Sequence, residues 1–136
     1  MTKMMNIIEK TIKVLIIEDE MVLNIDVQNS LEEMGYKISG IESTAHGAIN
    51  NIKNKSPNII IVDIHLKGYI RGLELVKQIW EKHKIPVVFL TSYSGDLVIK
   101  NSMEFEPYAY LIKPSKERDI DTAIKIALDM ITLNNI

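Results

Sequence analysis

Acidic residues that follow two apolar runs are the side chains best suited to chemistry in this chain. Glu18 and Asp19 come directly after the run 14–17, and Asp63 closes the run 59–62. A continuous run of mostly β-branched residues is typical of a strand buried on both faces. A carboxylate at the end of such a strand is expected at the carboxyl edge of the sheet, where open α/β folds bind ligands. We therefore expect the three carboxylates to lie close together.

Two further apolar runs extend this pattern, because one ends in Thr91 and Ser92 and the other in Lys113 and Pro114. Four strands would then carry carboxylates, a hydroxyl group and an ammonium group to one edge of the sheet. This combination predicts a phosphoryl-transfer site that holds a metal ion.

The metal expected at this site is Mg²⁺. Three carboxylates this close cannot all stay ionised unless a cation offsets their charge. Hard oxygen ligands at a partly hydrated site favour Mg²⁺, which takes one or two carboxylates and several waters. We assign Asp19 and Asp63 as direct ligands and place Glu18 nearby, bridged by water. The backbone carbonyl of His65 would complete the protein's share, and Mn²⁺ is the expected substitute metal.

Lys113 and Thr91 are predicted to bind the phosphoryl oxygens. An ammonium group on a flexible stem suits one oxygen, and before the transfer it would pair with Asp63. The hydroxyl of Thr91 can donate a hydrogen bond to a second oxygen, and the metal would meet the third. These groups together balance the charge of an in-line transfer. Asp63 is then the nucleophile, and the product is an acyl phosphate.

Apolar runs and amphipathic stretches alternate along the chain, which predicts a doubly wound α/β fold with a parallel sheet. Five strands are expected, at 14–17, 36–43, 58–63, 85–91 and 109–112, with the second near an edge of the sheet. Five helices are expected, at 22–34, 45–53, 72–84, 96–105 and 117–133.

Composition excludes several classes of protein. The 136 residues, 46% hydrophobic and 25% charged, are typical of one globular domain. A net charge of -2 provides no basic surface, so direct binding to nucleic acid is not expected. The chain has no cysteine, which excludes disulfides and favours a cytoplasmic protein. No apolar run is long enough to span a membrane.

We expect residues 1–12 to form an N-terminal leader, 13–133 the domain and 134–136 a short tail. The start of the chain lacks the apolar core and the cleavage site of a signal peptide. Whether the domain stands alone or was cut from a larger protein stays open.

Four segments together resemble the receiver domain of two-component response regulators: Val14–Glu20, Ile60–Leu66, Val88–Ser92 and Tyr110–Pro114. The resemblance covers about residues 13–133 and implies the flavodoxin-like fold of that family. It implies that Asp63 accepts a phosphoryl group from a phosphohistidine on a sensor histidine kinase or a phosphotransfer protein. It also implies a cis peptide bond between Lys113 and Pro114, which would direct the lysine inward.

The resemblance further implies a conformational switch. On phosphorylation Thr91 would move toward the phosphate, and Tyr110 would rotate into the space that it leaves. The surface of the fourth helix, fifth strand and fifth helix would change shape, and a downstream protein or a fused output domain would read it. Ser92 is small enough to keep the site open to a phosphodonor. The alternative for Tyr110 is an aromatic of the core or the sheet edge.

The loop after Asp63 departs from the family pattern. Many receivers have proline where this chain has Lys67, and an Asp-Gly pair one residue earlier than Arg71 and Gly72. Arg71 replaces the carboxylate that is expected to cap the next helix. The loop geometry is therefore expected to differ, while the chemistry is kept.

Each group has a simpler explanation when it is taken alone. Acids at 18–20 favour a helix N-terminus, Asp63 could cap a helix or loop, and Thr91 and Lys113 could be ordinary polar residues at strand ends. These explanations would have to coincide at four strand ends in the right order, which favours the phosphoryl-transfer site.

The leading functional prediction is a signalling module that catalyses its own phosphorylation and dephosphorylation rather than the turnover of a substrate. The alternative is a degenerate receiver that binds partners without phosphate. A phosphatase with an aspartyl intermediate usually has a second acid where this chain has His65. A dinucleotide-binding domain would need a glycine-rich loop after the first strand. A homodimer through the face around Val98, Ile99 and Met103 is a further hypothesis.

Overall fold

The computed structural model describes residues 11–18, 24–64, 69–91, 108–112 and 117–134, with side chains over 11–18, 27–62, 74–90 and 119–129. The described strands are β1 (Lys13–Glu18), β2 (Lys37–Glu42), β3 (Ile59–Ile64), β4 (Val87–Thr91) and β5 (Tyr108–Ile112). The described helices are α2 (Asn24–Glu33), α3 (Ala45–Lys55), α4 (Tyr69–His83) and α6 (Glu117–Asn134). No helix within these ranges is long and apolar enough to cross a membrane.

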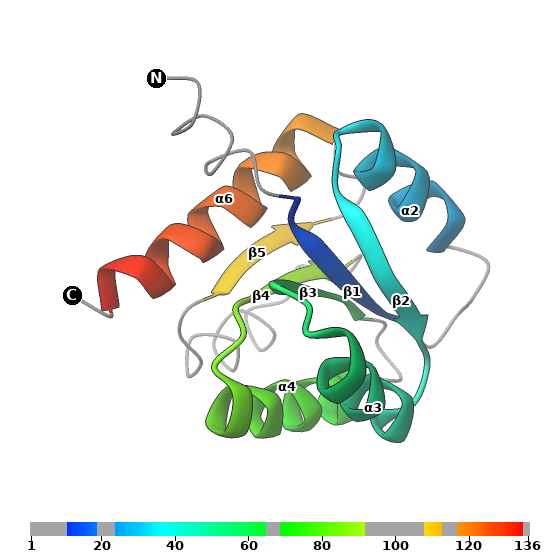
Figure 1. The fold of residues 1–136 in the computed structure, drawn as a ribbon, viewed down its shortest axis with the longest axis vertical. Coiled ribbons are helices and arrows are strands. Elements are labelled where there is room, and N and C mark those ends of the chain that lie inside the picture. The colour runs from blue at the N-terminus through cyan, green and yellow to red at the C-terminus, as the bar shows by residue number, and fades with distance from the viewer. Residues whose placement is uncertain (1–10, 19–23, 65–68, 92–107, 113–116, 135–136) are drawn as a thin grey trace.

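The five strands form one parallel sheet in the order β2-β1-β3-β4-β5 (Figure 1). The chain moves outward from β1 to β2, crosses back over β1 to β3, and then continues through β4 to β5. The direction of winding therefore reverses between β1 and β3, and ligands of open α/β sheets bind outside the carboxyl ends at such a point. The predicted doubly wound fold is confirmed, and so is the edge position of β2.

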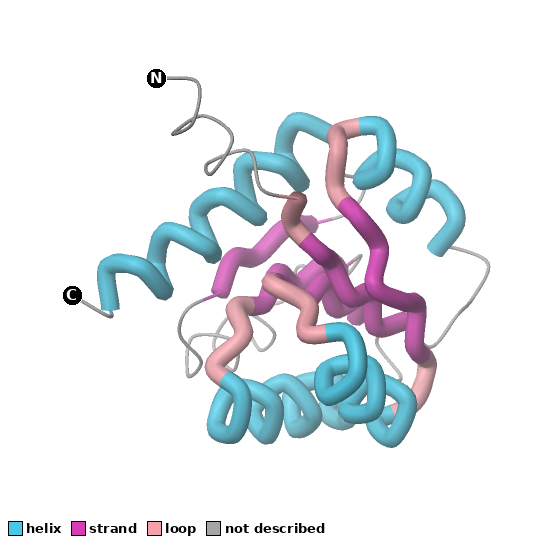
Figure 2. Tube along the Cα trace, in the orientation of Figure 1, coloured by secondary structure: helices cyan, strands magenta, loops and turns pink. Residues whose placement is uncertain are grey.

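Helices cover both faces of the sheet, with α3 and α4 on one side and α2 and α6 on the other (Figures 1 and 2). Alternate residues of the central strands β1, β3 and β4 enter the two layers, because successive side chains point to opposite faces. The layer under α3 and α4 contains Leu15, Ile17, Ile60, Val62, Phe89, Ala48, Ile52, Leu75, Val76 and Ile79. The layer under α2 and α6 contains Val14, Ile16, Ile59, Ile61, Val88, Leu90, Leu31, Ile120, Ala123, Ile124 and Ala127. The apolar runs of the central strands are continuous because both faces are buried.

The edge strand β2 carries a bulge. Val14 of β1 pairs with Ile38, but the next residue of β1 pairs with Gly40, so that Ser39 has no partner in the register. The hydroxyl of Ser39 donates a 2.9 Å hydrogen bond to Oδ1 of Asn51, whose Nδ2 donates a 2.8 Å bond to the carbonyl of Ser39. Asn51 belongs to α3 and is buried. This pair of bonds fixes α3 to the bulged edge of the sheet.

Capping residues define both ends of α3. The hydroxyl of Thr44 accepts a 3.0 Å hydrogen bond from the backbone N–H of Gly47 at the start of α3. Ser56 ends the helix in the left-handed conformation, with its N–H bonded to the carbonyl of Ile52. Helix α3 consequently runs to Lys55, two residues beyond its predicted end.

The predicted start of the next helix is also wrong. Helix α4 begins at Tyr69, three residues before the predicted start at Gly72. Arg71 is therefore the third residue of the helix and does not occupy a capping position in place of a carboxylate. The helix predicted at 96–105 lies outside the described residues.

Candidate functional site

The carboxyl ends of three neighbouring strands bring candidate residues together in the backbone. Glu18 is the last residue of β1, and its partner in β3 is Asp63. Thr91 is the last residue of β4, and its partner in β3 is Ile64, which follows Asp63. Neighbouring strands lie about 4.8 Å apart. The backbones at Glu18, Asp63 and Thr91 therefore occupy adjacent positions at the edge where the winding direction reverses.

Of the three residues at this edge, Glu18 is the one whose side chain the structure describes. Only 1% of the surface of Glu18 is exposed. Removing a carboxylate from water costs free energy unless hydrogen bonds or a cation compensate. A buried acid in register with a second acid is therefore suited to a site where a hard divalent cation offsets negative charge. Among the side chains that the structure describes, no three acidic or histidine groups gather in a way that could hold a metal. The predicted direct ligands are not among those side chains.

Strand β5 ends at the same edge, and the fourth candidate residue follows it in the sequence. Tyr110 is the partner of Phe89 in β4, and the last residue of β5, Ile112, is the partner of Thr91. Lys113 comes next in the sequence. The predicted site residues that lie outside the described residues are Asp19, His65, Ser92, Lys113 and Pro114. For Asp63, Thr91 and Tyr110 the structure describes the backbone, so the roles of their side chains stay predictions.

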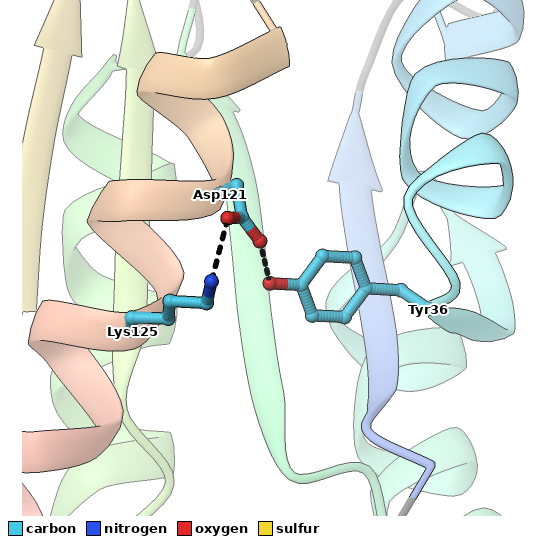
Figure 3. A network of polar contacts seen from close by, with 3 residues as sticks. All are labelled: Tyr36, Asp121 and Lys125. Atoms are coloured by element: carbon cyan, nitrogen blue, oxygen red, sulfur yellow. Dashed lines mark hydrogen bonds and ion pairs between the residues drawn. The ribbon is translucent and has the colours of Figure 1, made fainter. Parts of the chain in front are cut away.

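A polar network at the opposite edge of the sheet was not predicted. Tyr36, which precedes β2, donates a hydrogen bond from its hydroxyl to Oδ1 of Asp121 in α6. The Nζ atom of Lys125 lies 2.9 Å from Oδ2 of the same carboxylate (Figure 3). The spacing of Asp121 and Lys125 by four residues is a sequence signal for this ion pair. Nothing in the local sequence indicates Tyr36 as their partner.

The contacts of this network shift the pKa values of Asp121 and Tyr36. The hydrogen bond from Tyr36 and the contact with Lys125 lower the pKa of Asp121. Burial and the neighbouring carboxylate raise the pKa of the Tyr36 hydroxyl well above its ordinary value. The hydrogen bond from Tyr36 to Asp121 links α6 to the start of β2. Tyr36 lies at the amino ends of the strands, so the network is remote from the candidate site at their carboxyl ends.

Comparison with known proteins identifies the family. Residues 14–125 match the model of the response regulator receiver domain. The transcriptional regulatory protein PdtaR of Mycobacterium tuberculosis is 29% identical over 116 residues, which are 85% of this chain and 56% of that protein. The transcriptional regulatory protein YdfI of Bacillus subtilis is 30% identical over 118 residues, or 83% of this chain and 55% of that protein. The chain thus spans about half the length of the curated relatives it matches.

Solved structures agree with the family model. The signal receiver domain of a modulated diguanylate cyclase from Desulfovibrio desulfuricans superposes with a TM-score of 0.80 at 26% identity, covering 92% of this chain and 99% of that one. A CheY-like response regulator receiver domain protein from Methanospirillum hungatei superposes with a TM-score of 0.77 at 25% identity, with the same coverage of 92% and 99%. The match to the family model extends over most of the chain, from β1 into α6. This chain therefore belongs to the family of response regulator receiver domains.

Proposed function

We propose that this receiver accepts a phosphoryl group on Asp63 from a sensor histidine kinase or a phosphotransfer protein. The observation that carries the proposal is the pairing of Glu18 with Asp63 where the winding of the sheet reverses, with Glu18 buried. Burial of an acid beside a second acid costs free energy that a divalent cation would offset. An interaction module that works without phosphate has no need of this arrangement.

The transfer is a displacement at phosphorus. An oxygen of the Asp63 carboxylate attacks, the bond from phosphorus to the histidine nitrogen breaks, and the imidazole leaves with the electron pair and takes up a proton. Asp19, Asp63 and the carbonyl of His65 would hold Mg²⁺, with Glu18 reached through water, and the bound ion would neutralise phosphoryl charge. Thr91 and Lys113 bind the remaining phosphoryl oxygens.

The acyl phosphate then changes a surface of this domain that a partner recognises. Thr91 and Tyr110 transmit its presence to the surface made by residues 96–105, β5 and α6, and a downstream protein or a fused output domain reads that surface. The names of two relatives, both transcriptional regulatory proteins, support a regulatory output. We place this activity in the cytoplasm and in the domain at residues 13–133.

Intact-mass spectrometry after incubation with acetyl phosphate tests the proposal. The wild type is expected to gain the mass of one phosphoryl group when Mg²⁺ is present and nothing when the metal is chelated. Asp63→Asn should gain nothing under either condition. Asp129→Asn is the matched control, because Asp129 is an exposed acid of α6 and the variant should behave as the wild type.

A receiver that does not react with acetyl phosphate can still accept a phosphoryl group from a protein donor. The incubation is therefore repeated with a phosphorylated histidine phosphotransfer protein. An adduct that persists in Asp63→Asn would place the acceptor elsewhere. Failure of both donors, together with no binding of Mg²⁺, would contradict the proposal and favour the phosphate-independent interaction module.

A further inference from the structure

The outer edge of β2 has a sequence that is complementary to itself in the antiparallel direction. β2 is the last strand on its side of the sheet, and no described strand pairs with its outer edge. When its sequence, KISGIE, is set against a reversed copy, Lys37 lies opposite Glu42, Ile38 opposite Ile41, and Ser39 opposite Gly40. We propose that this edge is a self-association site, at which a second copy of the chain pairs its own β2 and joins the two sheets into one.

Side chains of β2 face the directions that this pairing requires. Residues directly opposite one another in an antiparallel pair share one face of the sheet. Ile38 and Ile41 both pack toward the α2 and α6 layer. The carboxylate of Glu42 lies on the α3 side, where it approaches Gly47. Each isoleucine would thus meet an isoleucine of the second copy on the same face.

The strand register assigns Lys37 to the same face as Glu42. Its partner in β1 is Lys13, whose ammonium group donates a hydrogen bond to the carbonyl of Lys55 at the end of α3. Paired residues of neighbouring strands share a face, and Lys37 is itself exposed. Two ion pairs between Lys37 and Glu42 would therefore form on the α3 side of the joined sheet.

The bulge at Ser39 makes the two kinds of contact compatible. In a regular strand, residues separated by an odd number of positions lie on opposite faces. Lys37 and Glu42, like Ile38 and Ile41, would then be split between the two layers, and a symmetric pairing would set unlike faces together. The extra residue at the bulge returns each pair to one face. Two copies related by a twofold axis perpendicular to the sheet can then form the Lys37–Glu42 ion pairs and the Ile38–Ile41 contacts at the same time.

A hollow lies beside the start of β2. It has a volume of about 370 Å³ and is lined by Gln28, Glu32, Gly35, Tyr36, Lys37 and Ile38. In the antiparallel arrangement, Ile41 of the second copy lies opposite Ile38 at the rim of this hollow. Lysine on an edge strand normally discourages such pairing, but here its charge is matched. A contact limited to six residues of each strand is small, so the association is expected to be weak and concentration-dependent.

Sedimentation equilibrium of the full chain over a range of concentrations tests the proposal. The weight-average mass of the wild type should rise from 15.5 kDa toward twice that value. Lys37→Glu sets acid against acid at both ends of the pairing, and Glu42→Lys sets lysine against lysine. Either variant is expected to raise the dissociation constant about tenfold or more, since each ion pair is replaced by repulsion. Mixing the two variants restores both ion pairs, and the mixture should associate as the wild type does.

Controls for the charge changes come from exposed positions away from the edge. Lys77→Glu and Glu81→Lys, both in α4, alter the net charge equally and should associate as the wild type does. A wild type that stays monomeric at every concentration overturns the proposal. So does a mixture of the two edge variants that stays monomeric although circular dichroism shows both to be folded. The protein is used without a phosphodonor, so failure here leaves the proposed phosphoryl transfer untouched.

Discussion

Asp121 receives a hydrogen bond from Tyr36 and an ion pair from Lys125, and its ionisation therefore contributes to stability. These contacts lower its pKa in the folded state below the ordinary value of 3.8. A depressed pKa gives stability that is fully present above the unfolded value and is lost as the pH falls through the folded value. The network should thus be at full strength near neutral pH and weaken in acid.

Asp121→Asn tests this sign. The variant is expected to lower the free energy of unfolding by about 1 kcal/mol at neutral pH, because a charged hydrogen bond and an ion pair become neutral contacts. The difference from the wild type should begin to shrink as the pH falls below 3.8 and should vanish below the lowered folded pKa, where the wild-type carboxyl is also neutral. Urea unfolding at a series of pH values measures it, and Asp119→Asn on the exposed side of α6 is the control. A difference that stays constant with pH would contradict the argument.

At the scale of elements, α3 and β2 depend on one close approach. Asn51 bonds to both the hydroxyl and the carbonyl of Ser39, and a Cβ atom added to Gly40 would overlap the amide nitrogen of Asn51. Gly40→Ala is therefore expected to lower the free energy of unfolding by about 1–3 kcal/mol. Asn51→Ala should cost a similar amount, because the partly buried carbonyl of Ser39 loses the donor that Asn51 provides.

The two substitutions should not be additive. Once Asn51 is truncated, the added methyl group at position 40 no longer meets the amide, so the double variant is expected to be more stable than the sum of the single losses implies. A double-mutant cycle by urea unfolding measures the coupling. Gly35→Ala is the control for the glycine change, because its Cβ meets no atom within 4 Å and its cost comes from the positive φ alone. Strict additivity of Gly40→Ala and Asn51→Ala would contradict the predicted contact.

The end of α3 offers a substitution in the stabilising direction. Ser56 adopts φ of 52°, a conformation that favours glycine over residues with a Cβ. Ser56→Gly is expected to raise the free energy of unfolding by about 0.5–1 kcal/mol. Lys84→Gly at the end of α4, where φ is 55°, should gain less, because the lysine ammonium lies 4.8 Å from the centre of the Trp80 ring. Thermal unfolding of both variants measures the order, and an equal or larger gain for Lys84→Gly would contradict it.

Sequence periodicity predicted the central strands well because β1, β3 and β4 are buried on both faces and appear as unbroken apolar runs. The alternation in β2 is weak for a physical reason, since the bulge sets Ile38 and Ile41 on one face at a spacing of three. The start of α4 was predicted three residues too late, because residues 69–71 were assigned to the loop after Asp63 and lie inside the helix. The bond between Tyr36 and Asp121 joins residues far apart in the chain, and no local pattern reports it.

At the scale of the whole molecule, the candidate site exists only when the sheet is assembled. Glu18 and Asp63 belong to strands that are separated in sequence by β2 and two helices, and they become neighbours through the pairing of β1 with β3. Residue types at strand ends were enough to predict this edge, because parallel strands must present their carboxyl ends together. The geometry of the proposed metal ligands was beyond that reasoning, since it depends on side chains of the loops that follow the strands.

A site formed only on folding links metal binding to stability. If Mg²⁺ binds the folded chain at this edge, it should raise the free energy of unfolding by about 2.7 kcal/mol when its concentration is one hundred times Kd. Glu18→Gln removes one negative charge from the buried end of β1 and should weaken that gain. Glu33→Gln, an exposed acid of α2, should leave it unchanged. Unfolding in urea at several concentrations of Mg²⁺, repeated with Mn²⁺, measures the linkage. An equal gain in all three proteins would mean that the ion binds elsewhere, because a cation held beside Glu18 must respond to the loss of that charge.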